Sequence, residues 1–554
     1  MKSVRVFALP LVLPVVLYVV LRPENYGLTP NSIDPLYYTG YAINLDDMLH
    51  AAGLGRYFVT RWTMYLPAHV LTLIFGPFGG RLMLRLLLAA AILTALWRLG
   101  RRWKWNIHQE LLAGVVLLTM PMFVRAFFTD YFEYAVAAYG LLLVAVSLRV
   151  RQSAWSASAM GVLLAVVMIA NPFSVVMAAA PICTALWFGV SSWRERWRMV
   201  AWVVGSFVAV VLFGLLYFRW GYGLDNIYRP TFEFLGNAPR DPLSATRLLW
   251  LGRYTWIYAP PIAVLAYVGI ARIRRVRLDR TERLLIGMVA FQYFAHVVDQ
   301  MTRGDGLEIS YYWSGMYPVF GMLLAVGLAK AARGARPVLV YGAIVLWLAF
   351  LIRGVPHRLR LPHAVWFVLV VLVVLALAVA IARWSVFGGA LVAVALIGWT
   401  HMGPPPYHPQ SYGDLDTSPR YDLLFRQGPY GREDFYENGV WFVEQMDRVP
   451  NDADAWFVSA DVLSGLYFFL YGIAVSHRGL SGDADITEAM MSMRAESSSD
   501  GPITVALLGP PAMMPDLVER WSSALPAATT VLDTTGGVAD GLRLVVLTWG
   551  QASS

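Results

Sequence analysis

Long apolar runs alternate with short polar or basic segments over the first 400 residues of the chain. A membrane-spanning helix needs about 20 mostly apolar residues, and the runs come close to that length. The pattern predicts an all-α polytopic membrane domain of about 13 transmembrane helices over residues 1–400. The predicted spans are residues 5–21, 80–98, 108–127, 131–148, 157–190 (two short spans broken at Asn171-Pro172), 199–218, 254–271, 283–299, 311–329, 337–353, 363–382 and 385–400.

Two further apolar segments are predicted to lie in the membrane interface. Residues 63–76 are apolar but too short to span, and counting them as a span would move the basic residues 101–104 to the outer face. Residues 40–52 are predicted to form one amphipathic interfacial helix. Its apolar positions are Tyr41, Ala42, Leu45, Met48, Leu49 and Ala52, and its polar face carries Asn44, Asp46, Asp47 and His50.

The pattern changes after the turn-rich segment 403–406, where the chain becomes more polar. Strand-like and helix-like runs alternate there, which predicts a C-terminal α/β domain over residues 401–554. The apolar run 462–475 is short for a span and is predicted to be a buried helix. The strand-like runs are 455–459, 503–509 and 542–549, and the helix-like runs are 437–447 and 515–523.

Composition and charge agree with a membrane protein and orient it. The 554 residues are 58% hydrophobic and 14% charged, whereas soluble domains carry about 25% charged residues. Lys and Arg accumulate in cytoplasmic loops, so the basic segments place the N-terminus in the cytoplasm and residues 22–63 and the C-terminal domain outside. The net charge of +8 fits contact with anionic membrane lipids, and we expect no nucleic-acid partner. The basic segments are Lys2 with Arg5, and residues 98–104, 149–151, 194–198, 272–283 and 330–336.

The predicted outer loops carry the candidate functional residues. The first holds Asp34 followed by aromatic residues, and it continues to the basic and aromatic segment around Arg61. The second is short and places carboxylates close to hydrocarbon, where charge is expensive. The third, residues 219–254, is rich in Tyr, Arg and Asp and is long enough to act as a lid. The candidates are Asp34, Tyr37, Tyr38, Arg61, Asp130, Tyr131, His296, Arg303 and Glu308.

The order of these parts resembles the GT-C superfamily of membrane glycosyltransferases, on the branch of protein O-mannosyltransferases and lipid A aminoarabinose transferases. The resemblance covers about residues 1–330 and rests on short motifs in a fixed order. These motifs are Asp34-Pro-Leu-Tyr37-Tyr38, Arg61-Trp-Thr-Met-Tyr65-Leu-Pro67, Phe75-Gly76, Arg81 with Arg85, and Thr129-Asp130-Tyr131.

The resemblance implies an inverting glycosyltransferase of the cell envelope, in the inner (plasma) membrane of a bacterium. Such enzymes move a sugar from a polyprenyl-phosphate donor to a glycan, lipid or protein acceptor at the extracytoplasmic face. By that resemblance Asp34 is the general base, and Asp130 orients a substrate or holds a metal. Arg61, with Arg303, stabilises the departing phosphate, which needs fixed positive partners.

Several points stay open from the sequence alone. Pro35 stands where many relatives have a second carboxylate, so use of a divalent metal is undecided. His296 and Glu308 could join Asp34 or Asp130 in three dimensions. Asp34 could instead begin a turn, Asp130 could cap a helix, and Arg61 could extend toward lipid headgroups.

Two other functions fit parts of the pattern. A polyprenyl-diphosphate-dependent glycan polymerase or ligase would use Arg303 and His296 and leave Asp34 without a role. A lipid or solute transporter would carry ionisable residues deep within its spans and broken helices in two repeated halves. Here the charged residues cluster in loops and no internal repeat is visible.

Overall fold

The computed structural model contains two compact units. The first comprises residues 1–23, 85–217 and 237–427, and the second comprises residues 24–84, 218–236 and 428–554. The predicted domain boundary near residue 400 lies outside the described residues. The structure describes residues 12, 34–50, 55–119, 123, 126–127, 132–149, 153–190, 192–237, 259–273, 275, 277–303, 316–333, 336–338, 340–342, 344–345, 433–449, 456–460, 464, 467–468, 479–481, 486, 503–525, 528–537 and 541–549.

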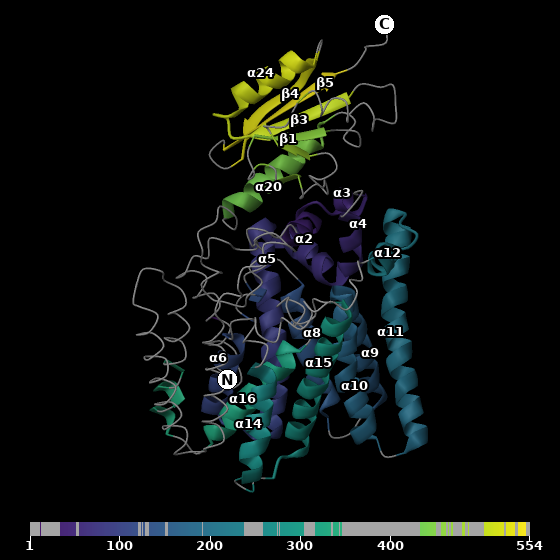
Figure 1. Ribbon diagram of the computed structural model, residues 1–554, viewed down its shortest axis with the longest axis vertical. Coiled ribbons are helices and arrows are strands. Elements are labelled where there is room, and N and C mark those ends of the chain that lie inside the picture. Colours follow the sequence, from purple (N-terminus) through teal and green to yellow (C-terminus); the bar gives the residue numbers. More distant parts are fainter. Residues whose placement is uncertain are drawn as a thin grey trace. The chain divides into compact units, whose positions relative to one another are not determined.

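Three helical segments in the described residues are long and apolar enough to cross a membrane: Val59–Arg102, Trp193–Tyr222 and Arg280–Met301. Shorter apolar helices accompany them, and the predicted count of 13 spans stays a prediction. The helices of the first unit (Figure 1) are the second part of α5 (Trp62–Arg102), α6 (Ile107–Leu118), α8 (Glu133–Ser147), α9 (Ala154–Ala170), α10 (Val175–Gly189), most of α11 (Trp193–Tyr222), α14 (Ala259–Ile273), α15 (Arg280–Arg303) and α16 (Tyr317–Ala331).

Local sequence signals fix several helix ends. Asn106 and Ser153 begin α6 and α9 with reciprocal side-chain and backbone hydrogen bonds, the capping box. The predicted break at Asn171-Pro172 is confirmed: α9 ends at Ala170, the 3₁₀ turn η2 covers Pro172–Ser174, and α10 follows. Proline at this point cannot donate a helical hydrogen bond, which favours the break.

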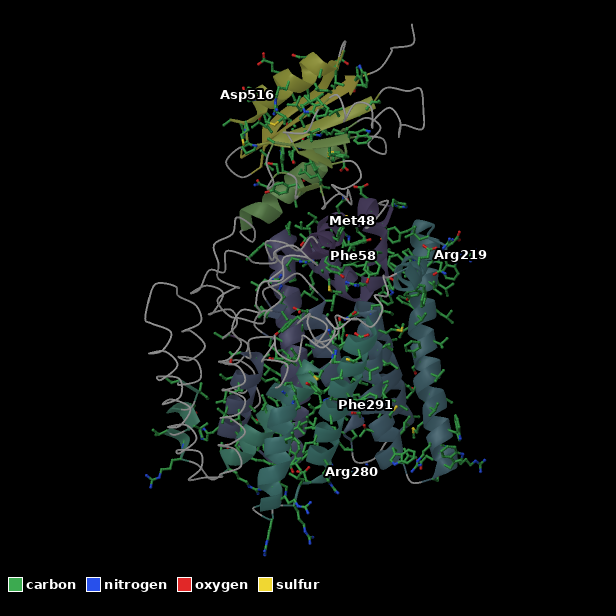
Figure 2. The ribbon with its side chains drawn as sticks, in the orientation of Figure 1. Met48, Phe58, Arg219, Arg280, Phe291 and Asp516 are labelled. Carbon is green, nitrogen blue, oxygen red and sulfur yellow. The ribbon has the colours of Figure 1, made fainter. Side chains whose placement is uncertain are left out.

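The centre of the first unit is formed by α8 and α16, which pack against each other and against α9, α6, α10 and α15. Nearly every described side chain of α16 is buried. By contrast, α11 exposes large apolar side chains such as Trp202, Phe213 and Trp220. Phe291, midway along α15, is also exposed (Figure 2). Such continuous exposed apolar surface is typical of lipid-facing helices.

A polar network ties the ends of four elements together in the first unit. Lys330 Nζ lies 2.9 Å from Asp279 Oδ2 and 2.7 Å from Glu282 Oε1. The indole of Trp103 donates to Asp279 over 3.0 Å, and the phenol of Tyr267 donates to Glu282. Burial alone would raise the pKa of the Asp279 carboxyl, but hydrogen bonds from the Glu282 backbone, Lys330 and Trp103 outweigh it and lower that pKa.

The second unit begins with short helices: α2 (Asp34–Ile43), α3 (Leu45–His50), α4 (Gly55–Phe58) and the 3₁₀ turn η1 (Val59–Arg61). The single helix predicted over 40–52 is wrong, because the chain forms two helices that meet at Asn44. Asn44, expected on the polar face, is 9% exposed, whereas the apolar positions of that prediction are buried as expected up to Leu49. Figure 2 places Met48 and Phe58 within this group of helices.

A sharp bend divides α5 at Gly76, whose φ of 76° lies in the left-handed region that glycine tolerates. Four residues later the backbone passes close to itself, because a Cβ on Gly80 would lie 2.4 Å from the backbone nitrogen of Thr72. The bend coincides with the end of the predicted 63–76 segment. That this segment lies in the membrane interface stays a prediction.

The predicted α/β fold of the C-terminal residues is confirmed. Five strands form one mixed sheet in the order β2-β1-β3-β5-β4, with β1 parallel to β2 and β3, and β5 antiparallel to β3 and β4. The three predicted strands correspond to β1, β3 and β5, whereas β2 and β4 were not predicted. The strands are β1 (Trp456–Ser459), β2 (Gly479–Ser481), β3 (Ile503–Gly509), β4 (Thr529–Gly536) and β5 (Leu542–Trp549).

Alternate side chains of the central strands pack against different helices, as the period of two dictates. One face, with Val505, Leu507 and Val545, packs against Trp521 of helix α24 (Met514–Ala524). On the other face Phe457 contacts Phe468, which in turn contacts Phe442 of helix α20 (Glu433–Met446). The two helices cover opposite faces of the sheet (Figure 1).

Candidate functional site

Arg61 is a buried arginine at the end of η1, only 4% exposed. Its guanidinium donates to the phenol oxygen of Tyr38 and, over 2.8 Å, to that of Tyr57. The guanidinium carbon also lies over the rings of Tyr38, Tyr57 and Phe58, at 5.6, 5.0 and 5.3 Å from their centroids. A cation held over several rings within about 6 Å is stabilised by their quadrupoles. The side chain is therefore held in one orientation, not extended toward lipid headgroups.

The aromatic residues that hold Arg61 are themselves tightly packed. Tyr37 stacks on Phe58 with ring centroids 4.8 Å apart, and Tyr38 meets the same ring edge-on at 5.3 Å. Neither tyrosine side chain is exposed. Because α2 carries both tyrosines and α4 carries Phe58, this packing positions Arg61 through two separate helices.

A second buried arginine reaches the same tyrosine. Arg81, 3% exposed, donates to the backbone carbonyl of Tyr38 over 3.2 Å. Tyr38 thus contacts one guanidinium through its phenol and another through its backbone. An anion bound beside Tyr38 would be attracted by both charges, and the low local dielectric strengthens that attraction.

The beginning of the third loop packs against η1 and the start of α5. The hydroxyl of Thr60 donates to the carbonyl of Ile227 over 3.0 Å and lies 2.5 Å from the hydroxyl of Thr231, on α12 (Arg229–Asn237). The indole of Trp62 donates to the phenol of Tyr228 over 3.2 Å. Burial raises the pKa of the Tyr228 phenol, against the lowering effect of that bond. These contacts put residues 227–231 against Thr60 and Trp62, the two sequence neighbours of Arg61, in the chain's second unit.

The remaining predicted residues are described only in part. Asp34 is the first residue of α2, and its side chain lies outside the described residues. Arg303 is the last residue of α15, also without a described side chain. His296 lies on the same helix and is 3% exposed. Asp130, Tyr131 and Glu308 lie outside the described residues.

The structure adds Tyr57 and Arg81 to the residues around Arg61. The signal for Arg81 was present in the sequence, because a charged residue inside an apolar run is costly and is usually retained for a function. No comparable signal marks Tyr57 among the many aromatic residues at predicted loop edges. Among the described residues, no group of three or more His, Cys, Asp or Glu side chains could hold a metal ion. The metal question stays open because Asp130 and the side chain of Asp34 are not among them.

Comparison with solved structures finds ArnT from Cupriavidus metallidurans bound to undecaprenyl phosphate, 15% identical, with 98% of each chain covered and a TM-score of 0.50. The chain has the fold of ArnT. The predicted GT-C fold is thereby confirmed. ArnT in the apo state is 16% identical over 97% of each chain, with a TM-score of 0.48. The Archaeoglobus fulgidus oligosaccharyltransferase in complex with Zn and sulfate is 10% identical over 90% of this chain and 67% of that one, with a TM-score of 0.40. No family model and no curated protein matches the chain.

Proposed function

We propose that the chain is an inverting membrane glycosyltransferase that takes a sugar from a polyprenyl-phosphate donor. The observation that carries the proposal is the buried guanidinium of Arg61, fixed by Tyr38 and Tyr57 with Arg81 on the same tyrosine. The fold shared with ArnT, which was crystallised with undecaprenyl phosphate, supports the class of donor.

The proposed chemistry is a single displacement at the anomeric carbon. An acceptor hydroxyl attacks that carbon from the face opposite the phosphate, and the bond from the carbon to the phosphate oxygen breaks. Its electron pair leaves with the polyprenyl phosphate. The acceptor proton passes to the carboxylate of Asp34, the proposed general base, which must lie within hydrogen-bond reach of it.

Arg61 suits the leaving group better than a lysine would. The planar guanidinium presents paired N–H donors that match two phosphate oxygens. Its orientation is fixed in advance by the ring contacts, so little reorganisation is needed when charge develops on the phosphate. Arg81, and Arg303 from the end of α15, are proposed as further positive partners of the donor.

Asp130 is proposed to orient donor or acceptor, or to hold a divalent metal. Tyr37, Tyr38, Tyr131, His296 and Glu308 are proposed to line the substrate site. The acceptor is a glycan, lipid or protein at the extracytoplasmic face of a bacterial inner membrane, with the N-terminus in the cytoplasm and the C-terminal α/β domain outside. A reporter placed at Gly53 and found in the cytoplasm would contradict this orientation.

The test is turnover of radiolabelled polyprenyl-phosphate sugars by the full chain in proteoliposomes. Replacement of Arg61 by Gln should lower kcat by about 10²–10³-fold, the usual cost of one electrostatic stabiliser. Replacement of Asp34 by Asn should lower it by about 10²–10⁴-fold, as expected for a general base. Arg61→Lys keeps the charge but loses the paired donors, and should fall between wild type and Arg61→Gln.

Matched controls come from an exposed pair in the same unit. Arg219 and Asp225 are 65% and 90% exposed and 3.9 Å apart, so Arg219→Gln and Asp225→Asn should leave turnover unchanged. Each variant is first compared with wild type by thermal unfolding, which separates a lost fold from a lost reaction. Undiminished transfer by a folded Asp34→Asn chain would refute the base assignment. Transfer from a polyprenyl-diphosphate donor alone would favour the polymerase or ligase, and lipid movement without transfer would favour a transporter.

A further inference from the structure

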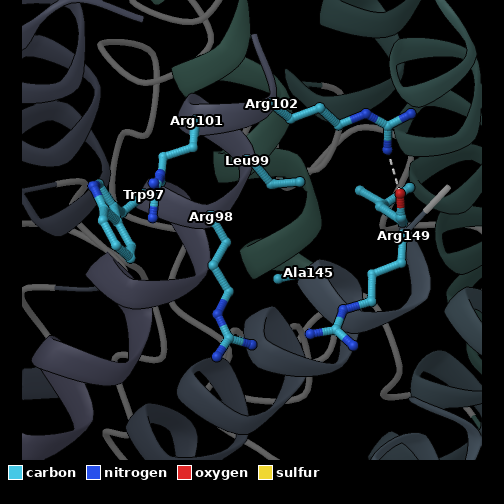
Figure 3. Close-up of a pocket in the computed structure, with 8 residues that line it drawn as sticks. Trp97, Arg98, Leu99, Arg101, Arg102, Ala145 and Arg149 are labelled. Carbon is cyan, nitrogen blue, oxygen red and sulfur yellow. Dashed lines mark hydrogen bonds between the residues drawn. The ribbon is translucent and has the colours of Figure 1, made fainter. Parts of the chain in front are cut away.

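A cavity of about 500 Å³ lies in the first unit, where the ends of α5 and α8 meet. Four arginines dominate its lining: Arg98, Arg101, Arg102 and Arg149 (Figure 3). The other lining residues are Trp97, Leu99, Ala145 and Leu148, so no carboxylate is among them. The volume is within the range of about 300–1,000 Å³ that is usual for small-molecule sites.

Two of the arginines are held in place by neighbours in the cavity wall. Arg102 donates to the backbone carbonyl of Leu148, which joins the end of α5 to the end of α8. Arg101 lies over the indole of Trp97, with its guanidinium carbon 4.8 Å from the ring centroid. Figure 3 shows the side chains of Arg98 and Arg149 extending in the same direction from the two helix ends. The lining arginines therefore come from two helix ends that are separate in sequence, and the side chains of Arg98 and Arg149 extend the same way.

The charge of the cavity is only partly compensated by its surroundings. Glu110 of α6 interacts electrostatically with Arg101. The C-terminal ends of α5 and α8 each contribute about half a negative charge. Glu110 and the two helix ends together offset about two positive charges, by that estimate. Among the described residues, neither Arg98 nor Arg102 forms an ion pair with a carboxylate.

The cavity lies at a helix end that is expected to meet the membrane surface. It follows directly on the apolar part of α5, one of the segments able to cross a membrane. Trp103 and Trp105 stack on each other just beyond it, with ring centroids 5.5 Å apart, and tryptophan is enriched where membrane meets water. Phosphate groups in this layer belong to lipids, and basic pockets between helices on the cytoplasmic side are suited to lipid headgroups.

We propose that this arginine cavity binds the headgroup of an anionic glycerophospholipid that carries two phosphates, in the leaflet predicted to be cytoplasmic. Two phosphodiesters bring two negative charges to a lining that has four guanidinium groups and no carboxylate. Each phosphate accepts paired hydrogen bonds from guanidinium groups. The cavity shares no residue with the group around Arg61, so it is a lipid site beyond the proposed reaction.

The experiment uses the full chain in nanodiscs of phosphatidylcholine, with a two-phosphate glycerophospholipid added in steps. Native mass spectrometry counts the bound lipid and gives its dissociation constant. We expect one tightly bound lipid for wild type. Its Kd should rise about 30-fold in the double variant Arg98→Gln/Arg149→Gln, at about 1 kcal/mol for each basic residue near the surface and 1.4 kcal/mol per tenfold in Kd.

A matched control removes the same charge from the same predicted face, outside the cavity. Arg272 and Arg277 are exposed, and the double variant Arg272→Gln/Arg277→Gln should keep the wild-type Kd. Equal weakening in both double variants would overturn the proposal, because the lipid would then respond to diffuse charge. Displacement of the lipid by millimolar inorganic phosphate would also overturn it, since the cavity would then take a free anion. A thermal unfolding profile like that of wild type shows that each variant is folded.

Discussion

Loss of the Lys330 ammonium should destabilise the chain, because it would leave Glu282 without its positive partner. The Glu282 side chain is 3% exposed, and Lys330 Nζ lies 2.7 Å from its carboxylate. The informative change is Lys330→Met, which keeps the length of the side chain and removes the charge. The hydrogen bonds from Tyr267 and from the backbone of Asp279 would remain, but neither supplies a formal charge.

The size of the effect follows from burial. Removing one partner of a buried ion pair costs about 3–5 kcal/mol. Lys330 and Asp279 are 31% and 38% exposed, so water screens part of the network and the lower end, about 3 kcal/mol, is expected. With an unfolding entropy of about 2.1 cal/mol/K per residue, a chain of 554 residues loses roughly 1 °C per kcal/mol, so the Tm should fall by about 3 °C.

The assay is thermal unfolding of the full chain in detergent, followed by intrinsic tryptophan fluorescence. Arg333→Met is the control, since Arg333 is an exposed arginine just past the same helix and its loss should leave the Tm within about 1 °C. The double variant Lys330→Met/Glu282→Gln should unfold at a higher temperature than Lys330→Met alone, because the buried charge is then gone as well. Additive losses in the double variant would refute the reasoning, since they would show that the two groups do not act as a pair.

Three further predictions test the packing and the electrostatics. Gly161→Ala should cost about 1–3 kcal/mol of stability, because its Cβ would lie 2.2 Å from a carbonyl oxygen of α11. Gly205→Ala is the control, since a Cβ there has nothing within 4 Å and should not destabilise the chain. Thermal unfolding compares the two variants. The lowered pKa of Asp279 means that its stabilisation is present above the unfolded pKa and is lost as the pH falls through the folded pKa. Asp279→Asn should therefore lower the Tm near neutral pH, and the fall of the Tm between pH 5 and 3 should be shallower than in wild type. A fall as steep as that of wild type would show that Asp279 does not cause the acid destabilisation. Arg543 pairs with Asp533 at 2.8 Å and lowers its pKa. Since both groups are partly exposed, Arg543→Ala should cost no more than about 1 kcal/mol of stability, measured by urea denaturation of the full chain. A larger loss would show that the pair is structural.

Part of the fold could be predicted because its causes are local. The strands β1, β3 and β5 are mostly apolar runs, as expected of strands buried at the centre of a sheet. Such a run can be recognised in the sequence without knowing which strands pair with it. The break between α9 and α10 follows from Pro172, which has no backbone N–H to donate. The strand β4 was missed because its sequence, rich in threonine, is mostly exposed, and it becomes a strand by pairing with the open edge of β5.

The candidate site was likewise predicted only where the signal is local in the sequence. Arg61 was predicted from its place in a short motif, and the resemblance that contained it led to the confirmed fold. Tyr57 and Thr231 were not predicted, since nothing near them in sequence shows what they contact. Thr231 meets Thr60 across a separation of 171 residues. The helix expected over 40–52 is divided at Asn44, a residue expected on the polar face that is only 9% exposed.

The sequence by itself determined the membrane class, the broken helix at Asn171-Pro172, the C-terminal α/β domain and the candidate role of Arg61. The first three depend on apolar periodicity, on charge or on the covalent geometry of a single residue, and the candidate role of Arg61 comes from the order of motifs that resembles the GT-C superfamily. Only the tertiary structure decided that Tyr38 contacts both Arg61 and Arg81, and that Arg149 joins three arginines of α5 around one cavity. Those contacts join helices far apart in sequence, and their positions depend on how apolar surfaces pack, which no local pattern specifies.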